Sequence, residues 1–175
     1  MDILRFCPYC GGELTERLLE TEDRPRLVCA HCQNVIYQNP RIVVATLPVN
    51  DHGVVLLRRG IEPRKGAWTY PGGYMELGES VEEAAIRETK EEVNLDVELT
   101  SLLDIYSRRE VGVVVIVFNA RVVGGEVRLT REALEVSEFA PEHIPWNELA
   151  FPSTVLALQD WVSIVRQSDR LRSVS

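Results

Sequence analysis

The sequence predicts an α+β protein in which a small cysteine-containing unit precedes one larger domain of strands and helices. All four cysteines fall within the first 37 residues. From Arg41 onward, β-branched strand patterns alternate with turn signals rich in Gly, Asn and Pro. Amphipathic helix patterns follow Ser80 and Pro152. A chain of 175 residues is long enough for one such domain with its own core and a small satellite.

The composition excludes several classes of protein. A hydrophobic content of 45%, a charged content of 26% and a mean hydropathy of -0.07 are typical of globular proteins. The longest apolar run, 111–120, contains Gly112 and Asn119 and is too short to cross a bilayer. Residues 1–6 lack the apolar core of a secretory signal, so we expect a cytoplasmic protein with reduced thiols. The net charge of -8 argues against binding to nucleic acids or anionic membranes.

The cysteines form two Cys-x2-Cys pairs with eighteen residues between them, at Cys7, Cys10, Cys29 and Cys32. This spacing is typical of a structural zinc ribbon, in which two tight turns offer four thiolates to one tetrahedral Zn²⁺. Two disulfides or a redox dithiol of the Cys-Pro-Tyr-Cys type are the alternatives. We interpret His31 as a bystander, because four thiolates saturate the ion. The sequence therefore predicts a zinc ribbon over residues 1–37, and such a site leaves no open coordination position for chemistry.

Strand patterns fill much of the chain. After the turn signal at Asn39–Pro40, segments 42–49 and 54–57 flank Asn50-Asp-His-Gly53 and predict a β-hairpin. Shorter strands are predicted in the first unit at 26–29 and 35–37. Later strands are predicted at 97–104, 111–122, 126–129 and 137–140, with Gly124–Gly125 as a hairpin turn.

Two segments carry helix signals. Ser80-Val-Glu-Glu83 is a capping box, and Asn94 is suited to the left-handed conformation that ends a helix. Pro152-Ser153 opens a second helix whose apolar stripe is completed by Trp161. The stripe comprises Val155, Leu158, Val162 and Val165. The segment after Arg166 is polar, so we expect a main domain over 38–168 and a frayed tail over 169–175.

The first helix is unusually acidic. Between positions 76 and 98 the chain has nine acidic residues against two basic ones. Glu88, Glu91 and Glu92 are spaced i, i+3 and i+4, so they project from one face and repel one another. A divalent cation such as Mg²⁺ or Mn²⁺ removes this repulsion and links carboxylates to substrate phosphates. Arg87 can pair with Glu79 and hold the preceding loop against the helix.

Residues 73–95 resemble the Nudix box, Gly-x5-Glu-x7-Arg-Glu-U-x-Glu-Glu-x-Gly-U, where U is a bulky apolar residue. The matching positions are Gly73, Glu79, Arg87, Glu88, Glu91, Glu92 and Leu95. Thr89 and Asn94 depart from the pattern, at an apolar position and at the second glycine. Neither departure removes a carboxylate. The resemblance implies an α/β/α sandwich with a mixed sheet.

The resemblance also implies an activity: hydrolysis of a nucleoside diphosphate linked to another group, with catalytic Mg²⁺ or Mn²⁺. Glu88 and Glu92 would be the main metal ligands, with Glu91 adding to the cluster or activating water, and Glu79 and Arg87 would orient it. The backbone carbonyl of Gly72 is a further ligand in some relatives. The general base differs among Nudix enzymes and is either a box glutamate or a residue on a later loop. Glu132 and Glu135 lie where many relatives place a late acid, and of the two we favour Glu135.

The order of ribbon, Tyr-Gln-Asn-Pro40, box and a late Ile-Pro-Trp-Asn-Glu-Leu segment is similar to a Nudix subgroup that hydrolyses FAD, ADP-ribose and related dinucleotides. We therefore expect FAD or ADP-ribose as substrate, with AMP as one product. Substrate contacts are expected from Arg58, Trp68, Tyr70, Gly72 and Gly73, although alternation before Pro71 also places at least one ring in the core.

Alternative substrates are NADH, oxidised nucleotides and capped RNA, and a non-catalytic nucleotide sensor is an alternative of another class. The resemblance implies a small nucleotide as partner and no membrane. Homodimers are common in such enzymes, but nothing in the sequence fixes the oligomeric state.

Overall fold

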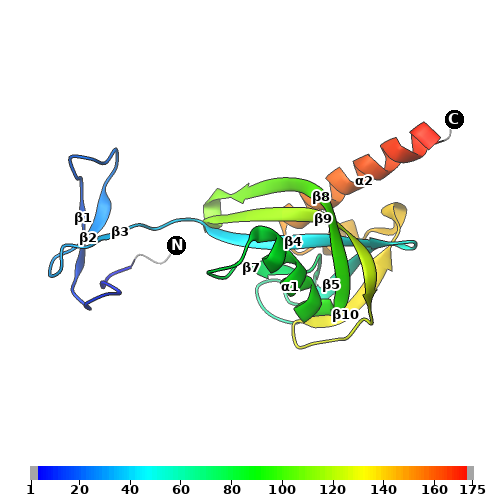
Figure 1. The fold of residues 1–175 in the computed structure, drawn as a ribbon, viewed down its shortest axis with the longest axis horizontal. Helices are drawn as coiled ribbons and strands as arrows, with labels where there is room; N and C mark the ends of the chain where they lie inside the picture. Colours follow the sequence, from blue (N-terminus) through cyan, green and yellow to red (C-terminus); the bar gives the residue numbers. More distant parts are fainter. Residues whose placement is uncertain (1–3, 173–175) are drawn as a thin grey trace. The chain divides into compact units, whose positions relative to one another are not determined.

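The computed structural model describes residues 4–172. The chain divides between Pro40 and Arg41 into two compact units, which Figure 1 shows in blue and in cyan to red. None of the helices in the described range is long and apolar enough to cross a membrane. Each unit has its own buried cluster and is described separately.

The first unit is a small antiparallel sheet. Strands β1 (Leu14–Arg17), β2 (Arg26–Cys29) and β3 (Val35–Ile36) lie in the order β1-β2-β3. The sequence predicted β2 and β3 but not β1, whose only buried side chain is Leu14. The buried members of its apolar cluster are Leu14, Leu27, Cys7 and Cys29, and Cys32 and Ile36 pack against them partly buried.

The second unit contains a mixed sheet. Its strands are β4 (Arg41–Asn50), β5 (Gly53–Arg59), β6 (Trp68–Thr69), β7 (Gly72–Tyr74), β8 (Leu95–Arg108), β9 (Val113–Gly125) and β10 (Ala133–Phe139). The main order is β10-β5-β4-β9-β8, with β6 on β5 and β7 on β4. The β4–β9 pair is parallel and its neighbours are antiparallel. The predicted hairpin is present, although β4 and β5 pair only beside their turn, at Val49–Val54 and Asn50–Gly53.

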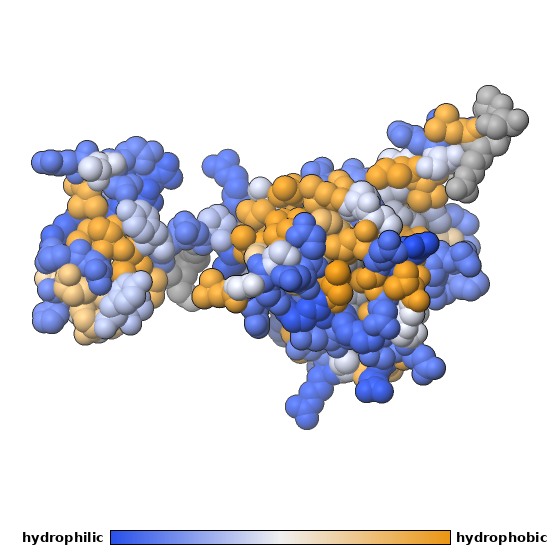
Figure 2. Space-filling model, viewed as in Figure 1, coloured by the Kyte–Doolittle hydropathy of each residue, from blue (hydrophilic) through white to orange (hydrophobic). Residues whose placement is uncertain are grey.

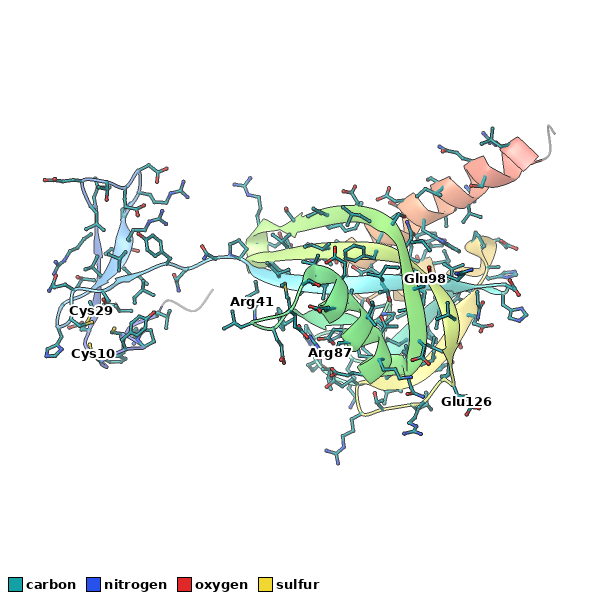
Figure 3. All side chains as sticks on the ribbon, in the orientation of Figure 1. Cys10, Cys29, Arg41, Arg87, Glu98 and Glu126 are labelled. Atoms are coloured by element: carbon teal, nitrogen blue, oxygen red, sulfur yellow. The ribbon has the colours of Figure 1, made fainter. Side chains whose placement is uncertain are left out.

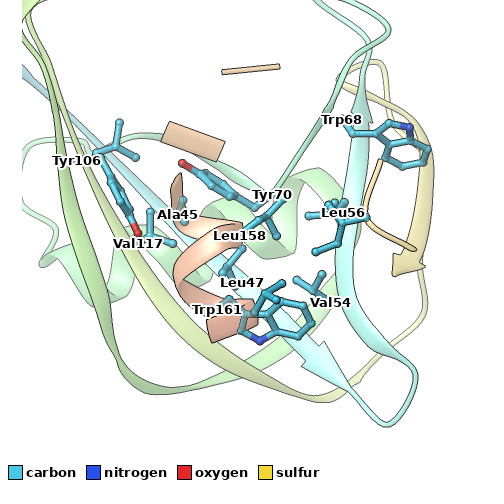
Figure 4. Packing of buried hydrophobic residues seen from close by; sticks show 14 residues of the cluster. Ala45, Leu47, Val54, Leu56, Trp68, Tyr70, Tyr106, Val117, Leu158 and Trp161 are labelled. Carbon is cyan, nitrogen blue, oxygen red and sulfur yellow. The ribbon is translucent and has the colours of Figure 1, made fainter. Parts of the chain in front are cut away.

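Helices α1 (Val81–Val93) and α2 (Pro152–Arg172) bury their apolar stripes on opposite faces of this sheet. Alternation along β4 explains how both faces are filled: Ala45 and Leu47 pack with Leu158 of α2, and Val44 packs with Ala84 and Ala85 of α1. Figure 4 shows the larger cluster around Leu158 and Trp161. The short 3-10 helices are η1 (Arg109–Val111), η2 (Pro141–His143) and η3 (Trp146–Glu148). The predicted α/β/α layering is confirmed.

Three local predictions were wrong. Residues 126–129 form no strand, and Gly124–Gly125 ends β9 opposite Leu95 and Asp96 instead of forming a hairpin turn. The segment is instead held at the end of α1, because Asn94 Nδ2 donates to the Glu126 carbonyl and the Arg128 N–H donates to the Val93 carbonyl. Helix α2 also continues past Arg166 to Arg172, so the expected fraying does not begin there. Residues 173–175 of the predicted tail lie outside the described residues.

Because β4 and β5 diverge beyond their turn, the short strands β6 and β7 occupy the opening between them. Gly72 and Gly73 pair with Ala45 and Val44 of β4. A Cβ on Gly72 would lie 2.5 Å from the Val44 carbonyl oxygen, so this strand approaches β4 at a distance that only glycine permits. The divergence thereby brings a glycine backbone directly to the start of the loop that leads into α1.

Candidate active site

Both ends of α1 are fixed by local hydrogen bonds. The Ser80 hydroxyl accepts the Glu83 N–H at 3.2 Å, and the Glu83 carboxylate accepts the Ser80 N–H at 2.8 Å, which confirms the capping box. Asn94 ends the helix at φ 57°, in the left-handed conformation, and its N–H donates to the Lys90 carbonyl. Asparagine therefore replaces the box glycine without changing the backbone. The helix presents its carboxylates from a rigid frame.

Glu92 and Glu88 face the β7 backbone. Glu92 is 7% exposed, and its Oε2 accepts the Gly72 N–H at 2.7 Å. The Glu88 carboxylate lies so close over Gly73 that a Cβ at that position would overlap it. Two carboxylates of α1 thus approach the same stretch of main chain: Glu92 through the Gly72 N–H, and Glu88 through the space that the missing side chain of Gly73 leaves.

The electrostatics of this pair fit a cation site. Burial, with a smaller contribution from the neighbouring charges of Glu88 and Glu132, raises the pKa of Glu92 to about 8, although the hydrogen bond from the Gly72 N–H opposes the shift. Burial also raises the pKa of Glu88, although its ion pair with Arg87 opposes the shift. A cation placed beside these two carboxylates would stabilise their ionised forms. Oxygen donors of this kind, gathered at one helix face, match the ligands that Mg²⁺ and Mn²⁺ prefer.

Arg87 links the loop to the helix. Its Nε and NH2 donate to the two carboxylate oxygens of Glu79 at 2.5 and 2.9 Å, and NH2 also donates to the Tyr74 carbonyl at 3.2 Å. Its NH1 pairs with Glu88 at 2.8 Å and Glu91 at 3.1 Å. The guanidinium holds the pKa of Glu79 down to about 2. Figure 3 shows Arg87 on α1, and the contacts support an orienting role for Arg87 and Glu79.

The carboxylates open onto a cleft of about 220 Å³. It is lined by Glu88, Glu91, Glu92, Thr130, Arg131 and Glu132. Figure 2 shows hydrophilic side chains gathered over the α1 side of the second unit. From the sequence we considered Glu132 but favoured Glu135 as the general base, and we did not identify Thr130 or Arg131 as site residues. Nothing in their spacing from the box reveals that the loop before β10 returns to α1.

Glu135 and Arg58, both predicted site residues, lie outside this cleft lining and pair with each other. They are opposite one another in the β10–β5 register, with Arg58 NH1 3.3 Å from Glu135 Oε2. Arg58 NH2 is 3.2 Å from Glu148 Oε2, and its Nε donates to the Gly66 carbonyl. We therefore correct the preference for Glu135: strand pairing directs it to Arg58, while Glu132 on the loop reaches the acidic cluster.

Trp68 and Tyr70 are buried, each 6% exposed, within the core cluster that Figure 4 shows. The Trp68 ring meets Phe139 edge to face at 5.0 Å. The expectation that these rings stack on a substrate base is not supported, because neither presents a free face to the cleft. The alternation before Pro71 correctly indicated a core position.

Thr89, a departure from the box, has a buried polar partner. Its hydroxyl donates to the Ala85 carbonyl at 2.8 Å, and the Thr46 hydroxyl lies 2.7 Å from it. Both side chains are fully buried. The Thr46 N–H donates to the Pro71 carbonyl at 3.1 Å, directly before Gly72. A single residue of β4 thus contacts both α1 and the residue that directly precedes β7.

This arrangement predicts unequal effects of removing each hydroxyl. Thr89→Val leaves the buried Thr46 hydroxyl without an acceptor, so we expect it to lower the free energy of unfolding by about 1–3 kcal/mol. Thr46→Val should cost less, because the Thr89 hydroxyl keeps its bond to Ala85. The Thr46→Val/Thr89→Val double variant should be more stable than Thr89→Val. Urea unfolding of the variants measures this, and a double variant less stable than both single ones would contradict it.

In the first unit, the sulfurs of the four cysteines all lie within 4.8 Å of one another. The Cys7–Cys32 and Cys10–Cys29 sulfurs are 3.7 and 3.5 Å apart, and Figure 3 shows Cys10 beside Cys29. Four thiolates about 2.3 Å from one Zn²⁺ would be separated by similar distances. The backbone N–H of Cys32 donates to the Cys29 sulfur and lowers the pKa of that thiol to about 6.

The alternatives for these thiols fit less well. All four cysteines are free thiols, and they form one cluster instead of two disulfides. The first pair lies in a turn before β1, in a unit whose described residues, 4–40, form strands and no helix, unlike the βαβ setting of redox dithiols. His31 is exposed and does not belong to the cluster, in agreement with its interpretation as a bystander. The donor set is therefore that of a closed structural zinc site.

Two models of known protein families match the two units of the chain. A model described as "NUDIX domain" matches residues 39–160, and the zinc-ribbon model described as "Nudix N-terminal" matches residues 5–38. A solved NUDIX hydrolase from Nitrosomonas europaea superposes with a TM-score of 0.86 at 36% identity, covering 91% of each chain.

Two curated relatives differ in their named activities. An ADP-ribose pyrophosphatase of Methanocaldococcus jannaschii is 38% identical over 120 residues, covering 66% of this chain and 70% of that protein. An NAD-capped RNA hydrolase, NudC, of Edwardsiella ictaluri is 41% identical over 95 residues. The matched region covers 53% of this chain but only 34% of the length of that protein. This chain thus spans about a third of the NudC relative. The domain match, together with the carboxylate cluster on α1 and the ribbon before it, shows that the chain belongs to the Nudix hydrolase family.

Proposed function

We propose that this protein hydrolyses the diphosphate of ADP-ribose or a related nucleoside diphosphate derivative such as FAD, with Mg²⁺ or Mn²⁺ and with AMP as one product. The observation that carries this is the convergence of Glu88, Glu91 and Glu92 on one cleft beside the Gly72–Gly73 backbone. The similarity to the Methanocaldococcus jannaschii pyrophosphatase supports ADP-ribose as the first substrate to test.

In this proposal Glu88 and Glu92 hold the catalytic cation, and exposed Glu91 completes the cluster. A bound divalent cation would neutralise charge on the phosphates and lower the pKa of water. The Gly72 N–H orients Glu92, and the Gly72 carbonyl remains a candidate ligand. Arg87 and Glu79 position the loop and Glu88. Phosphoryl chemistry requires mainly such positioning and charge stabilisation from a protein.

We assign the general base to Glu132. It is exposed on the cleft wall, and its charge already acts on Glu88 and Glu92. Glu135 is neutralised by Arg58. A carboxylate that faces the metal cluster without an ion pair of its own among the described residues is suited to take a proton from an attacking water.

NAD-capped RNA is a second candidate substrate, favoured by the similarity to NudC over the box region. The net charge of -8 argues against it, since RNA binding requires a basic surface. The sensor alternative loses support, because every box carboxylate is present and the chain belongs to a hydrolase family.

The substrate is tested by incubating the full chain with Mg²⁺ or Mn²⁺ and a panel of ADP-ribose, FAD, NADH, 8-oxo-dGTP and NAD-capped RNA. Chromatography identifies the products. We expect the highest kcat/KM with ADP-ribose or FAD, giving AMP plus ribose 5-phosphate or FMN. Turnover of capped RNA alone would favour the second candidate, and no turnover of any compound would contradict hydrolysis of these classes.

A further inference from the structure

Arg131 is a cation of the cleft that has no acidic partner among the described residues. It is exposed and lines the cleft together with the box carboxylates. Within residues 4–172 no ion pair involves Arg131, whereas Arg87, the other arginine beside these carboxylates, pairs with Glu79, Glu88 and Glu91. No carboxylate among residues 4–172 therefore takes the hydrogen-bond donors of the Arg131 guanidinium, and the residue itself lines the cleft.

The backbone that carries Arg131 is fixed on both sides. The Thr130 hydroxyl accepts the N–H groups of Glu132 and Ala133 at 3.1 and 3.0 Å. The Gly60 N–H donates to the Glu132 carbonyl at 2.8 Å, and a Cβ at Gly60 would overlap the Arg131 carbonyl. Ala133, the first residue of β10, is fully buried. The side chain of Arg131 can move, but its Cα is held at the cleft wall.

Charge explains why a cation is useful here. A cleft with four glutamates repels a diphosphate, even when a divalent cation offsets part of that charge. Arg59, at the end of β5, adds positive charge that acts on Glu92, but its guanidinium is held by the Pro63 carbonyl at 2.9 Å and lies over Phe151. Of the two arginines, Arg131 is the one free to meet a ligand.

We propose that Arg131 binds the phosphoryl oxygens of the diphosphate substrate, whereas the sequence suggested a substrate contact from Arg58. This inference rests on the proposed function and names a contact within the same site. The planar guanidinium donates two parallel hydrogen bonds to a phosphate, a geometry that Lys does not reproduce. Arg58 is unsuited to this role, because Glu135, Glu148 and the Gly66 carbonyl already take its donors.

The same loop offers a matched control. Arg128 is exposed, makes no ion pair within the described range and does not line the cleft. Arg131→Gln and Arg128→Gln therefore remove the same charge three positions apart. A difference between them reports the position of the guanidinium and not the net charge of the protein.

The first measurement is calorimetric titration of the full chain with methylenediphosphonate, a diphosphate analogue that cannot be hydrolysed, at fixed excess Mg²⁺. We expect Arg131→Gln to weaken binding about tenfold or more, from the loss of one bidentate contact, and Arg128→Gln to change it less than twofold. Equal affinities of the two variants, or no measurable binding by the wild type, would overturn the inference.

The second measurement is the kinetics of ADP-ribose hydrolysis. Arg131→Gln should raise KM about tenfold, Arg131→Lys should raise it by less, and Arg128→Gln should match the wild type. Unfolding curves of the three variants are expected to coincide, because Arg131 and Arg128 are both exposed. If the wild type does not hydrolyse ADP-ribose, the proposed substrate is wrong, yet the methylenediphosphonate titration still decides the role of Arg131.

Discussion

Glu92→Gln is expected to lower kcat by at least roughly 10²–10³-fold, the loss typical of removing one charge-stabilising group from an active site. Glutamine has the same shape, and its amide oxygen can still accept the Gly72 N–H that Glu92 accepts at 2.7 Å. What it removes is one negative charge at a cation site, where Glu92 is nearly buried. The fold should be preserved, since the buried group becomes neutral and loses its desolvation penalty.

Steady-state kinetics against a confirmed substrate, at several Mg²⁺ concentrations, measures this effect. Glu98→Gln is the control: Glu98 is an exposed residue of β8 that pairs with Arg121 outside the cleft lining. It should retain wild-type kcat. Turnover of Glu92→Gln within a few-fold of the wild type would remove Glu92 from the ligand set, and an unfolded variant, shown by circular dichroism, would require Glu88→Gln instead.

Cys29→Ser is expected to abolish zinc binding and to unfold the first unit. The cluster that holds this unit together contains only Leu14, Leu27, Cys7 and Cys29 as buried members, and Cys29 is fully buried. Units below about 40 residues rarely fold on apolar burial alone, so metal binding supplies the missing free energy. Residues 41–172 have a separate core and should keep their melting temperature.

Metal analysis of the purified wild type should give about one zinc per chain, and Cys29→Ser should give almost none. Limited proteolysis should then cut the variant within residues 4–40 and leave the second unit intact. His31→Ala is the control, because His31 lies between two ligands yet stands outside the sulfur cluster. A wild type without zinc would contradict the structural site, and loss of zinc from His31→Ala would make His31 a ligand.

Local sequence patterns predicted most of the helices and strands, and they predicted which carboxylates and thiols cluster together. The capping box located the start of α1, and the i, i+3, i+4 glutamates located the carboxylate face, because helical periodicity alone determines which side chains share a face. The Cys-x2-Cys pairs were equally informative, since each pair forms its own turn. Where an element depends on distant partners, prediction was poorer: β1 was missed and 126–129 was wrongly assigned to a strand.

The sequence by itself thus determined the family, the helix with the carboxylate cluster and the four clustered cysteines, all of which depend on residues close together in the chain. Only the tertiary structure decided which later residues join them. Strand register places Glu135 opposite Arg58, and the anchored loop carries Arg131 and Glu132 to α1. The pairing of Thr46 with Thr89 was likewise visible only in the fold. These contacts join segments roughly 40 or more residues apart, and sheet pairing and loop closure, which bring such segments together, leave no periodic trace in the sequence.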